Sequence, residues 1–293
     1  MQVFYFSGGR RMIIKRSLNN NVVITENEDG IEQVVCGRGI AFKKKPGDEI
    51  DESLINQVFV LKNEQYNHRF QEIVTSIPLD YLDLTDEIID MIRSYLGKKM
   101  SDSIYITLSD HVFTAIERAK EGIHMPNTML WEIRNYYDSE YEIALKVLDM
   151  IEEKTGVRLK DDEAGFIALH IVNAETDESS LEKTMEQTKV IQEITRIVRY
   201  YFKKEFDTGS VHYYRFITHL KFFSQRLVRG TTYEGSEDDE LLNVVKKKYK
   251  ESFECTEKVA EMIQRNYKYR LSDEEKLYLT IHIHRIVNQN DNH

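Results

Sequence analysis

Two histidines of this sequence are each followed, seven residues later, by an arginine. His111 precedes Arg118 by this interval. His219 precedes Arg226 by the same interval. Residues seven apart lie two turns apart on one face of a helix, so each histidine is predicted to share a helix face with its arginine.

A second pair of histidines repeats in the same order, each preceded by a glutamate. Glu163 stands seven residues before His170. Glu275 stands seven residues before His282. The whole pattern therefore occurs twice, which indicates two homologous helical modules with two histidines each. The predicted modules cover residues 73–177 and 180–290.

Three kinds of chemistry could use histidines repeated in this way. Metal binding commonly needs ligands at i and i+4, whereas His282 and His284 are two residues apart and point around the helix. Acid–base catalysis needs a polar substrate pocket, and the sequence has no nucleophile motif or phosphate-cradling glycine loop. On both grounds, no metal or cofactor is expected. A lone histidine on an apolar helix is usually a core residue, but repetition in pairs favours phosphoryl acceptance, for which the donor protein supplies the active site.

A glycine-rich basic turn near the N-terminus has a different chemistry. Gly37 and Gly39 allow backbone angles and close approaches that a Cβ would forbid. Arg38 and the lysines at 43–45 attract phosphates, and Phe42 offers a face on which an unpaired base can stack. Such a turn is more often a solvated loop than a binding site, so it indicates RNA contact only together with the features below.

The elements around this turn are predicted to be short antiparallel strands. Three asparagines at residues 19–21 tolerate left-handed backbone angles and predict a tight turn between two strands. Asp29-Gly30 is a second hairpin signal, and residues 57–61 make a further strand. We therefore expect a small antiparallel domain over residues 12–66, which dimerisation would help to stabilise.

The chain changes from strand to helix periodicity after a polar segment at residues 62–72, which is predicted to be a linker or a leading helix. Residues 86–93 and 141–148 are amphipathic, and the chain has only three prolines, so long helices are expected. Residues 174–186 are rich in acidic and hydroxyl side chains and predict a polar break. The expected fold class is multidomain α+β, in which a small antiparallel β domain precedes two homologous all-α helical bundles.

Length, composition and charge set further limits. The 293 residues suffice for two or three domains. No apolar run approaches the ~20 residues that span a bilayer, so a cytoplasmic protein without membrane insertion is expected. Cys36 and Cys255 lack metal-ligand spacing and are expected to be reduced thiols. The net charge of −10 confines any nucleic-acid binding to a local patch.

Residues 1–11 fit poorly with the pattern that follows and are treated as an N-terminal extension. The Gly-Gly-Arg-Arg tetrapeptide at residues 8–11 directly precedes Met12. Gly and Arg codons can be purine-rich, so this tetrapeptide could be a translated ribosome-binding site. We hypothesise that the natural start is Met12; the alternative is a short disordered or strand-extending tail.

These motifs together resemble the BglG/LicT/SacY family of transcriptional antiterminators, and LicT-like members in particular. The resemblance covers Met12 to Val287 and rests on the triple asparagine, the glycine turn and the histidine motifs. It implies a co-antiterminator RNA-binding domain followed by two phosphotransferase-system regulation domains (PRDs). In that family the RNA-binding domain is a homodimer that grips a hairpin in the leader mRNA. This prevents an overlapping terminator from forming upstream of sugar-uptake genes.

The resemblance also implies RNA-binding residues. The positions that match the family's RNA contacts are Arg16, Asn21, Gly37, Arg38 and Phe42. A lysine is common where Arg16 stands, so this contact keeps its charge although its geometry can differ.

Opposed roles for the four histidines follow from the same resemblance. His111 and His170 correspond to sites phosphorylated through a sugar-specific transporter, enzyme II, when sugar is absent, which inactivates the protein. His219 and His282 correspond to sites phosphorylated by the phosphocarrier HPr, which activates it. His284 has no expected counterpart and is treated as a bystander. Repulsion between phosphates would open one dimer interface, and pairing with nearby arginines would close another.

Two rival functions have sequence signatures of their own. A DNA-binding activator with PRDs would need a helix-turn-helix, whereas residues 12–61 are predicted to form hairpins. A metal-dependent phosphohydrolase would need ligand spacing that the histidines lack. The chain is therefore expected not to be an enzyme.

Overall fold

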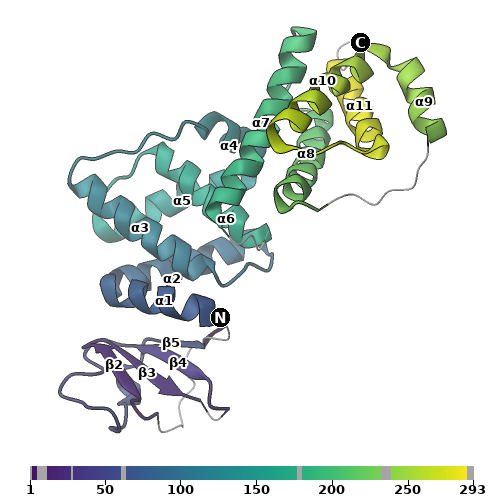
Figure 1. Cartoon of the computed structure of the whole chain (residues 1–293). Helices are drawn as coiled ribbons and strands as arrows, with labels where there is room; N and C mark the ends of the chain where they lie inside the picture. Colours follow the sequence, from purple (N-terminus) through teal and green to yellow (C-terminus); the bar gives the residue numbers. More distant parts are fainter. Residues whose placement is uncertain are drawn as a thin grey trace. The chain divides into compact units, whose positions relative to one another are not determined.

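The computed structural model in Figure 1 describes most of the chain. The described residues are 2–4, 12–27, 29–60, 64–176, 180–231 and 239–288. They belong to two compact units. The first unit consists of Met1–Leu130 and Tyr137–Ser179, and the second of Trp131–Tyr136 and Ser180–His293.

The first unit begins with a five-stranded antiparallel sheet. Its strands are β1 (Gln2–Phe4), β2 (Arg16–Asn19), β3 (Val22–Glu26), β4 (Glu32–Cys36) and β5 (Gln57–Val60), in the order β1-β5-β4-β3-β2. A short 3-10 helix, η1 (Glu52–Leu54), precedes β5. The strand β1 lies within the expected N-terminal extension, and pairs with β5. The other residues of that extension, up to residue 11, lie outside the described part.

Polar side chains close the two predicted hairpins. Asn19 Oδ1 accepts a hydrogen bond of 2.8 Å from the backbone N–H of Asn21, which turns the chain from β2 into β3. Asn27 Oδ1 accepts hydrogen bonds from Asp29 N (3.0 Å) and Ile31 N (2.8 Å) in the turn before β4. The sheet packs on a core of apolar residues. That core contains Ile14, Val23, Val35, Ile40, Ala41, Ile50 and Val58.

Helices complete the first unit. They are α1 (Glu64–Ser76), α2 (Leu79–Leu96), α3 (Ile104–Lys120), α5 (Asp138–Thr155) and α6 (Asp161–Thr176). The helix α3 packs between α2 and α6. Val112 and Ile116 of α3 and Ile167 of α6 are all fully buried, and burial of such apolar side chains stabilises the packed helices of this unit. The rings of Phe59 in β5 and Phe70 in α1 meet edge to face, with 4.7 Å between centroids.

The second unit is helical. Its helices are α4 (Leu130–Tyr136), α7 (Leu181–Phe202), α8 (Val211–Arg229), α9 (Asp239–Lys248), α10 (Lys250–Tyr267) and α11 (Asp273–Val287). The short helix α4 precedes α5 in the chain but packs on α7, where Tyr136 and Thr195 share a hydrogen bond of 2.9 Å. Ser210 caps the start of α8 by accepting a hydrogen bond of 3.1 Å from the backbone of Tyr213.

The predicted fold class, a small antiparallel domain before helical modules, is confirmed. The described part of residues 12–60 contains strands and no helix-turn-helix. The leading-helix alternative for residues 62–72 is the observed one, since α1 begins at Glu64. The predicted polar break at residues 174–186 is longer than the observed one. The helix α6 continues to Thr176, and α7 begins at Leu181. Thr184, within the polar stretch, is already a buried residue of α7. Among the described residues, no helix is both long and apolar enough to cross a bilayer.

Candidate functional site

The first histidine pair lies where α3 packs against α6. The rings of His111 and His170 have centroids 4.9 Å apart. Glu163, at the start of α6, lies beside both His111 and Arg118 of α3. Its Oε2 is 3.0 Å from His111 Nε2, close enough for an ion pair although not aligned for a hydrogen bond. Its Oε1 accepts a hydrogen bond of 3.0 Å from Arg118 Nη2.

Burial and charge determine the protonation of this first cluster. Burial and the neighbouring His111 hold the pKa of His170 well below its ordinary value, so His170 is neutral at pH 7. Burial raises the pKa of Glu163, but the contacts with His111 and Arg118 outweigh it and leave this pKa below its ordinary value. The carboxylate of Glu163 is therefore ionised and rests against His111.

The second histidine pair has the same placement on α8 and α11. The rings of His219 and His282 are stacked, with centroids 5.0 Å apart and 25° between their planes. The ring of Tyr278 is also close, with its centroid 5.6 Å from that of His219. Burial, His282 and Arg226 lower the pKa of His219 to about 4. Burial, followed by the charges of two arginines on α11 and α8, also lowers the pKa of His282.

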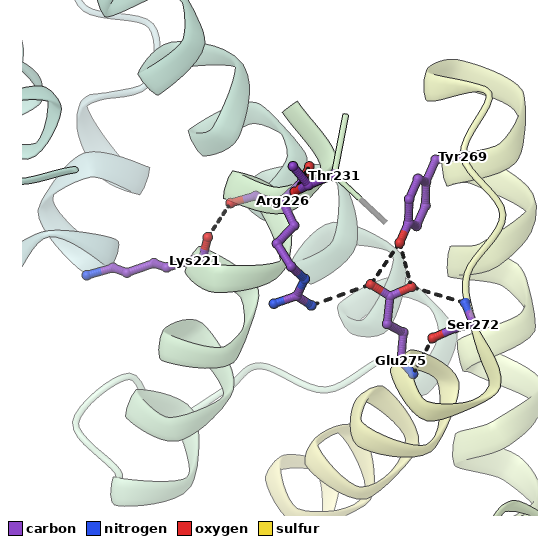
Figure 2. Close-up of polar contacts among 7 residues, drawn as sticks. Lys221, Arg226, Thr231, Tyr269, Ser272 and Glu275 are labelled. Carbon is purple, nitrogen blue, oxygen red and sulfur yellow. Dashed lines mark hydrogen bonds and ion pairs between the residues drawn. The ribbon is translucent and has the colours of Figure 1, made fainter. Parts of the chain in front are cut away.

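The glutamate of the second cluster has different partners, which Figure 2 shows. Arg226 Nη2 donates to Glu275 Oε1 over 3.4 Å. The hydroxyl of Tyr269 donates to both carboxylate oxygens, over 3.1 Å and 3.0 Å. The backbone N–H of Ser272 donates to Oε2 over 3.1 Å, and the Ser272 hydroxyl accepts from Glu275 N in return. Glu275 and Ser272 thus form a capping box at the start of α11.

His284 lies apart from this cluster. Its ring stacks on Tyr249 with 3.8 Å between centroids, and its Nδ1 is 2.8 Å from the amide nitrogen of Asn288. These contacts give His284 a packing role that does not involve His282. Among the described residues, no three His, Cys, Asp or Glu side chains gather in a way that could hold a metal ion.

The glycine turn is built around Asn21. Asn21 Oδ1 accepts a hydrogen bond of 2.8 Å from Gly39 N, and its backbone carbonyl accepts one of 2.9 Å from Gly37 N. Gly39 has a φ of +72°, which favours glycine. A Cβ on Gly37 would lie 1.8 Å from the carbonyl oxygen of Leu54. Asn21 and the two glycines therefore shape this turn.

The other three residues predicted to contact RNA are exposed. Phe42 is 59% exposed, and Lys43 Nζ lies 5.3 Å from its ring centroid. Arg16 Nη2 donates a hydrogen bond of 2.8 Å to Gln71 in α1. Arg38 Nη2 forms an ion pair of 2.6 Å with Asp80 in α2. Phe42 thus presents an exposed ring whose contact is with the neighbouring Lys43, whereas both arginines have partners in the helices that follow the sheet.

Models of two protein families match the chain. The PRD domain matches residues 86–174 and 190–286, and the CAT RNA binding domain matches residues 12–68. The chain belongs to the family of transcription antiterminators that join a CAT RNA binding domain to PRDs.

Two relatives compared by sequence agree with this assignment. The transcription antiterminator LicT of Bacillus subtilis (strain 168) is 49% identical over 278 residues, which cover 95% of this chain and 100% of that protein. The beta-glucoside operon antiterminator of Dickeya chrysanthemi is 44% identical and covers 94% of this chain and 96% of its own. Among solved structures, the crystal structure of GlcT CAT-PRDI is similar to part of this chain. The match is 37% identical in sequence, covers 57% of this chain and 99% of the GlcT chain, and has a TM-score of 0.48.

Each PRD match contains one histidine pair. His111 and His170 lie in the first PRD, and His219 and His282 in the second. The CAT match contains the residues predicted to contact RNA. These residues are Arg16, Asn21, Gly37, Arg38 and Phe42.

Sequence reasoning missed the residues that surround these sites. Tyr269 and Ser272 hold Glu275, and only the Ser-x-x-Glu spacing of a capping box gave a signal for one of them. Gln71 and Asp80 contact the two CAT arginines, and no local pattern could have indicated them.

Proposed function

We propose that this protein binds, as a dimer, a hairpin in a leader transcript and thereby prevents a terminator hairpin from forming ahead of sugar-utilisation genes. The observation that carries the proposal is the CAT RNA binding domain match over residues 12–68, joined to PRDs in one chain. The named functions of the antiterminator relatives support it.

The exposed side of the glycine turn is the part of the CAT domain suited to RNA. Phe42 can stack on an unpaired base, because every base has a π face. Arg38 and the lysines at 43–45 can contact phosphates in a chain whose overall charge is −10. Asn21 and Gly37 support the shape of the turn, so their contribution to RNA binding is partly structural.

The histidine pairs are the proposed inputs from the phosphotransferase system. In this proposal HPr phosphorylates His219 and His282, which activates the protein. A sugar-specific enzyme II phosphorylates His111 and His170, which inactivates it. Imidazole accepts a phosphoryl group through a nitrogen lone pair, and the low pKa of His219 keeps that imidazole neutral at pH 7.

A reconstituted phosphorylation assay tests this function. The full chain is incubated with phosphoenolpyruvate, enzyme I and HPr, and the phosphorylated residues are located by mass spectrometry at neutral pH. Acid-labile phosphate on His219 or His282, retained in His284→Ala, is the expected result. Binding of the same protein to its leader hairpin is measured in parallel by gel shift. A chain that takes no phosphate, or that binds duplex DNA in preference to the hairpin, would contradict the proposal.

A further inference from the structure

The two PRDs hold their matching glutamates in different ways. Each glutamate contacts the arginine of its own PRD. Glu163 pairs with Arg118, and Glu275 pairs with Arg226. In the first PRD, the remaining carboxylate oxygen lies 3.0 Å from His111 Nε2. In the second PRD, no carboxylate of the described residues lies within ion-pair distance of His219. The same residue type at the same position therefore contacts an imidazole in one PRD only.

Tyr269 and Ser272 explain why Glu275 does not contact His219. Both oxygens of Glu275 accept from the Tyr269 hydroxyl, and Oε2 also accepts from Ser272 N. Figure 2 shows the carboxylate enclosed by these donors on one side and by Arg226 on the other. Glu275 is only 2% exposed, so these contacts are sheltered from water. Its carboxylate is held in place by several donors at once.

The difference between the PRDs is present in the sequence. When the two glutamates are aligned, Val157 stands where the second PRD has Tyr269, and Lys160 stands where it has Ser272. Valine has no hydroxyl to donate, and lysine has no oxygen with which to close a capping box. In the first PRD the backbone N–H of Glu163 instead donates to the carbonyl of Lys160 over 2.9 Å. The Glu163 side chain is left to contact His111.

We propose that Tyr269 and Ser272 are positioning residues that withhold Glu275 from His219 and so make the second PRD the better phosphoryl acceptor. This inference rests on the proposed function. It adds a structural reason why the histidines of the two PRDs differ in how readily they accept phosphate. A carboxylate beside an imidazole nitrogen repels an approaching phosphoryl group and competes for that nitrogen. With Glu275 withheld, the phosphoryl group meets Arg226 without a carboxylate on the imidazole.

The first test measures the imidazole itself, in the full chain without phosphate. In Tyr269→Phe/Ser272→Ala, the ring that packs 6.4 Å from Phe223 is kept and both hydroxyls are removed. The backbone N–H at position 272 remains, but it loses the side-chain cap on Glu275 N that fixes its position. The groups that face His219 are otherwise unchanged: His282 and Tyr278 on α11, and Arg226 on α8. We expect nitrogen-15 NMR to show the pKa of His219 rising by about one unit or more as Glu275 reaches it. Adding Glu275→Gln should abolish the rise. An unchanged titration in the double variant would overturn the positioning role.

The second test measures phosphoryl acceptance with phosphoramidate, a small donor that needs no docking surface. Its P–N bond breaks to release ammonia as the bond between phosphorus and the imidazole nitrogen forms. Phosphate on His219 should appear about fivefold more slowly in the double variant, and Glu275→Gln should restore the rate. In the reciprocal variant Val157→Tyr/Lys160→Ser, His111 should become phosphorylated faster. Unchanged rates in both variants would overturn the proposal.

The two tests separate this inference from the proposed function. If HPr does not phosphorylate the wild-type chain, the proposed function fails, while the titration and the phosphoramidate rates still decide the positioning role. If HPr phosphorylates the wild type and the double variant at equal rates, and the titrations also agree, only the positioning role fails.

Discussion

Arg38 of the CAT domain and Asp80 of α2 form an ion pair, with 2.6 Å between Nη2 and Oδ1. The two residues are 42 positions apart in the chain. In the same unit, Arg16 donates to Gln71 of α1. Two cations of the proposed RNA interface are thus engaged by the helices that follow the sheet, and the proposal implies that RNA competes with these partners.

Removing the acidic partner should strengthen RNA binding. Asp80→Asn is expected to raise the affinity of the full chain for its leader hairpin by up to about fivefold, because exposed ion pairs contribute about 0.2–1 kcal/mol. Glu87→Gln is the matched control, because it also removes a negative charge from α2. Glu87 forms an ion pair with Lys154 and not with Arg38. Gel shift at constant salt measures both. Equal gains in the two variants would show a general charge effect instead of a specific contact.

Loss of the exposed aromatic should weaken RNA binding without loss of folding. Phe42→Ala is expected to cost about 1–3 kcal/mol of binding free energy if the ring stacks on a base. Its melting temperature should stay near that of the wild type, because the side chain is 59% exposed. Tyr95→Ala is a control, since Tyr95 is 55% exposed and lies on α2. Wild-type affinity in Phe42→Ala would remove the residue from the interface.

Two neighbouring glycines should respond differently to alanine. Gly37→Ala is expected to lower the free energy of unfolding by about 3 kcal/mol, because its Cβ would meet the Leu54 carbonyl at 1.8 Å. Gly39→Ala should cost only about 1 kcal/mol, since its φ of +72° is strained but no atom lies within 4 Å of the new Cβ. Thermal unfolding of the CAT domain measures which of the two variants loses more stability. Equal losses would contradict the role of the Leu54 contact.

The opposed inputs predict opposite phenotypes for histidine variants. His111→Ala and His170→Ala should leave antitermination active without inducer, because the inhibitory phosphate has no acceptor. His219→Ala and His282→Ala should lower activity, because the activating phosphate has none. A reporter gene behind the leader hairpin measures this, with His284→Ala as the control. Effects of the same sign from both PRDs would refute the opposed-input scheme.

Acid should destabilise the second PRD through His219. Its pKa of about 4 in the folded state lies below the value of 6.5 expected in an unfolded chain. The unfolded state therefore binds more protons in this range, so stability is full above pH 6.5 and falls as pH drops toward 4. A loss of about 1–2 kcal/mol between pH 7 and pH 5 is expected by chemical denaturation. His219→Gln should flatten this dependence, and an equally steep loss of stability in that variant would contradict the prediction.

Regular spacing in the sequence was sufficient to predict which motif residues share a helix face, but not that the two histidines of each PRD lie together. The seven-residue intervals place His111 with Arg118, and Glu163 with His170, on common helix faces. The contact between these two helices depends on how α3 packs against α6, which no interval within one helix specifies. The direct contact of Glu163 with His111 was therefore visible only in the structure.

Long-range partners limited what could be predicted for the RNA interface. Arg38 and Phe42 have the right chemistry, and their exposure follows from a turn that Asn21 and two glycines shape. Asp80 is an ordinary first-turn acid of a helix when read locally. Only the packing of that helix near the sheet brings Asp80 to Arg38 and so makes it a competitor in the proposed RNA interface.

The short helix α4 shows that the PRDs are not interchangeable as segments of sequence. The first PRD match, residues 86–174, includes α4, yet Trp131–Tyr136 packs with α7 in the second unit. Ile133 and Tyr136 are almost fully buried there. A chimera that took its first PRD from another antiterminator would bring in a foreign α4 and bury it against a surface that did not evolve with it. Grafting should therefore succeed only when α4 and α7 come from the same parent.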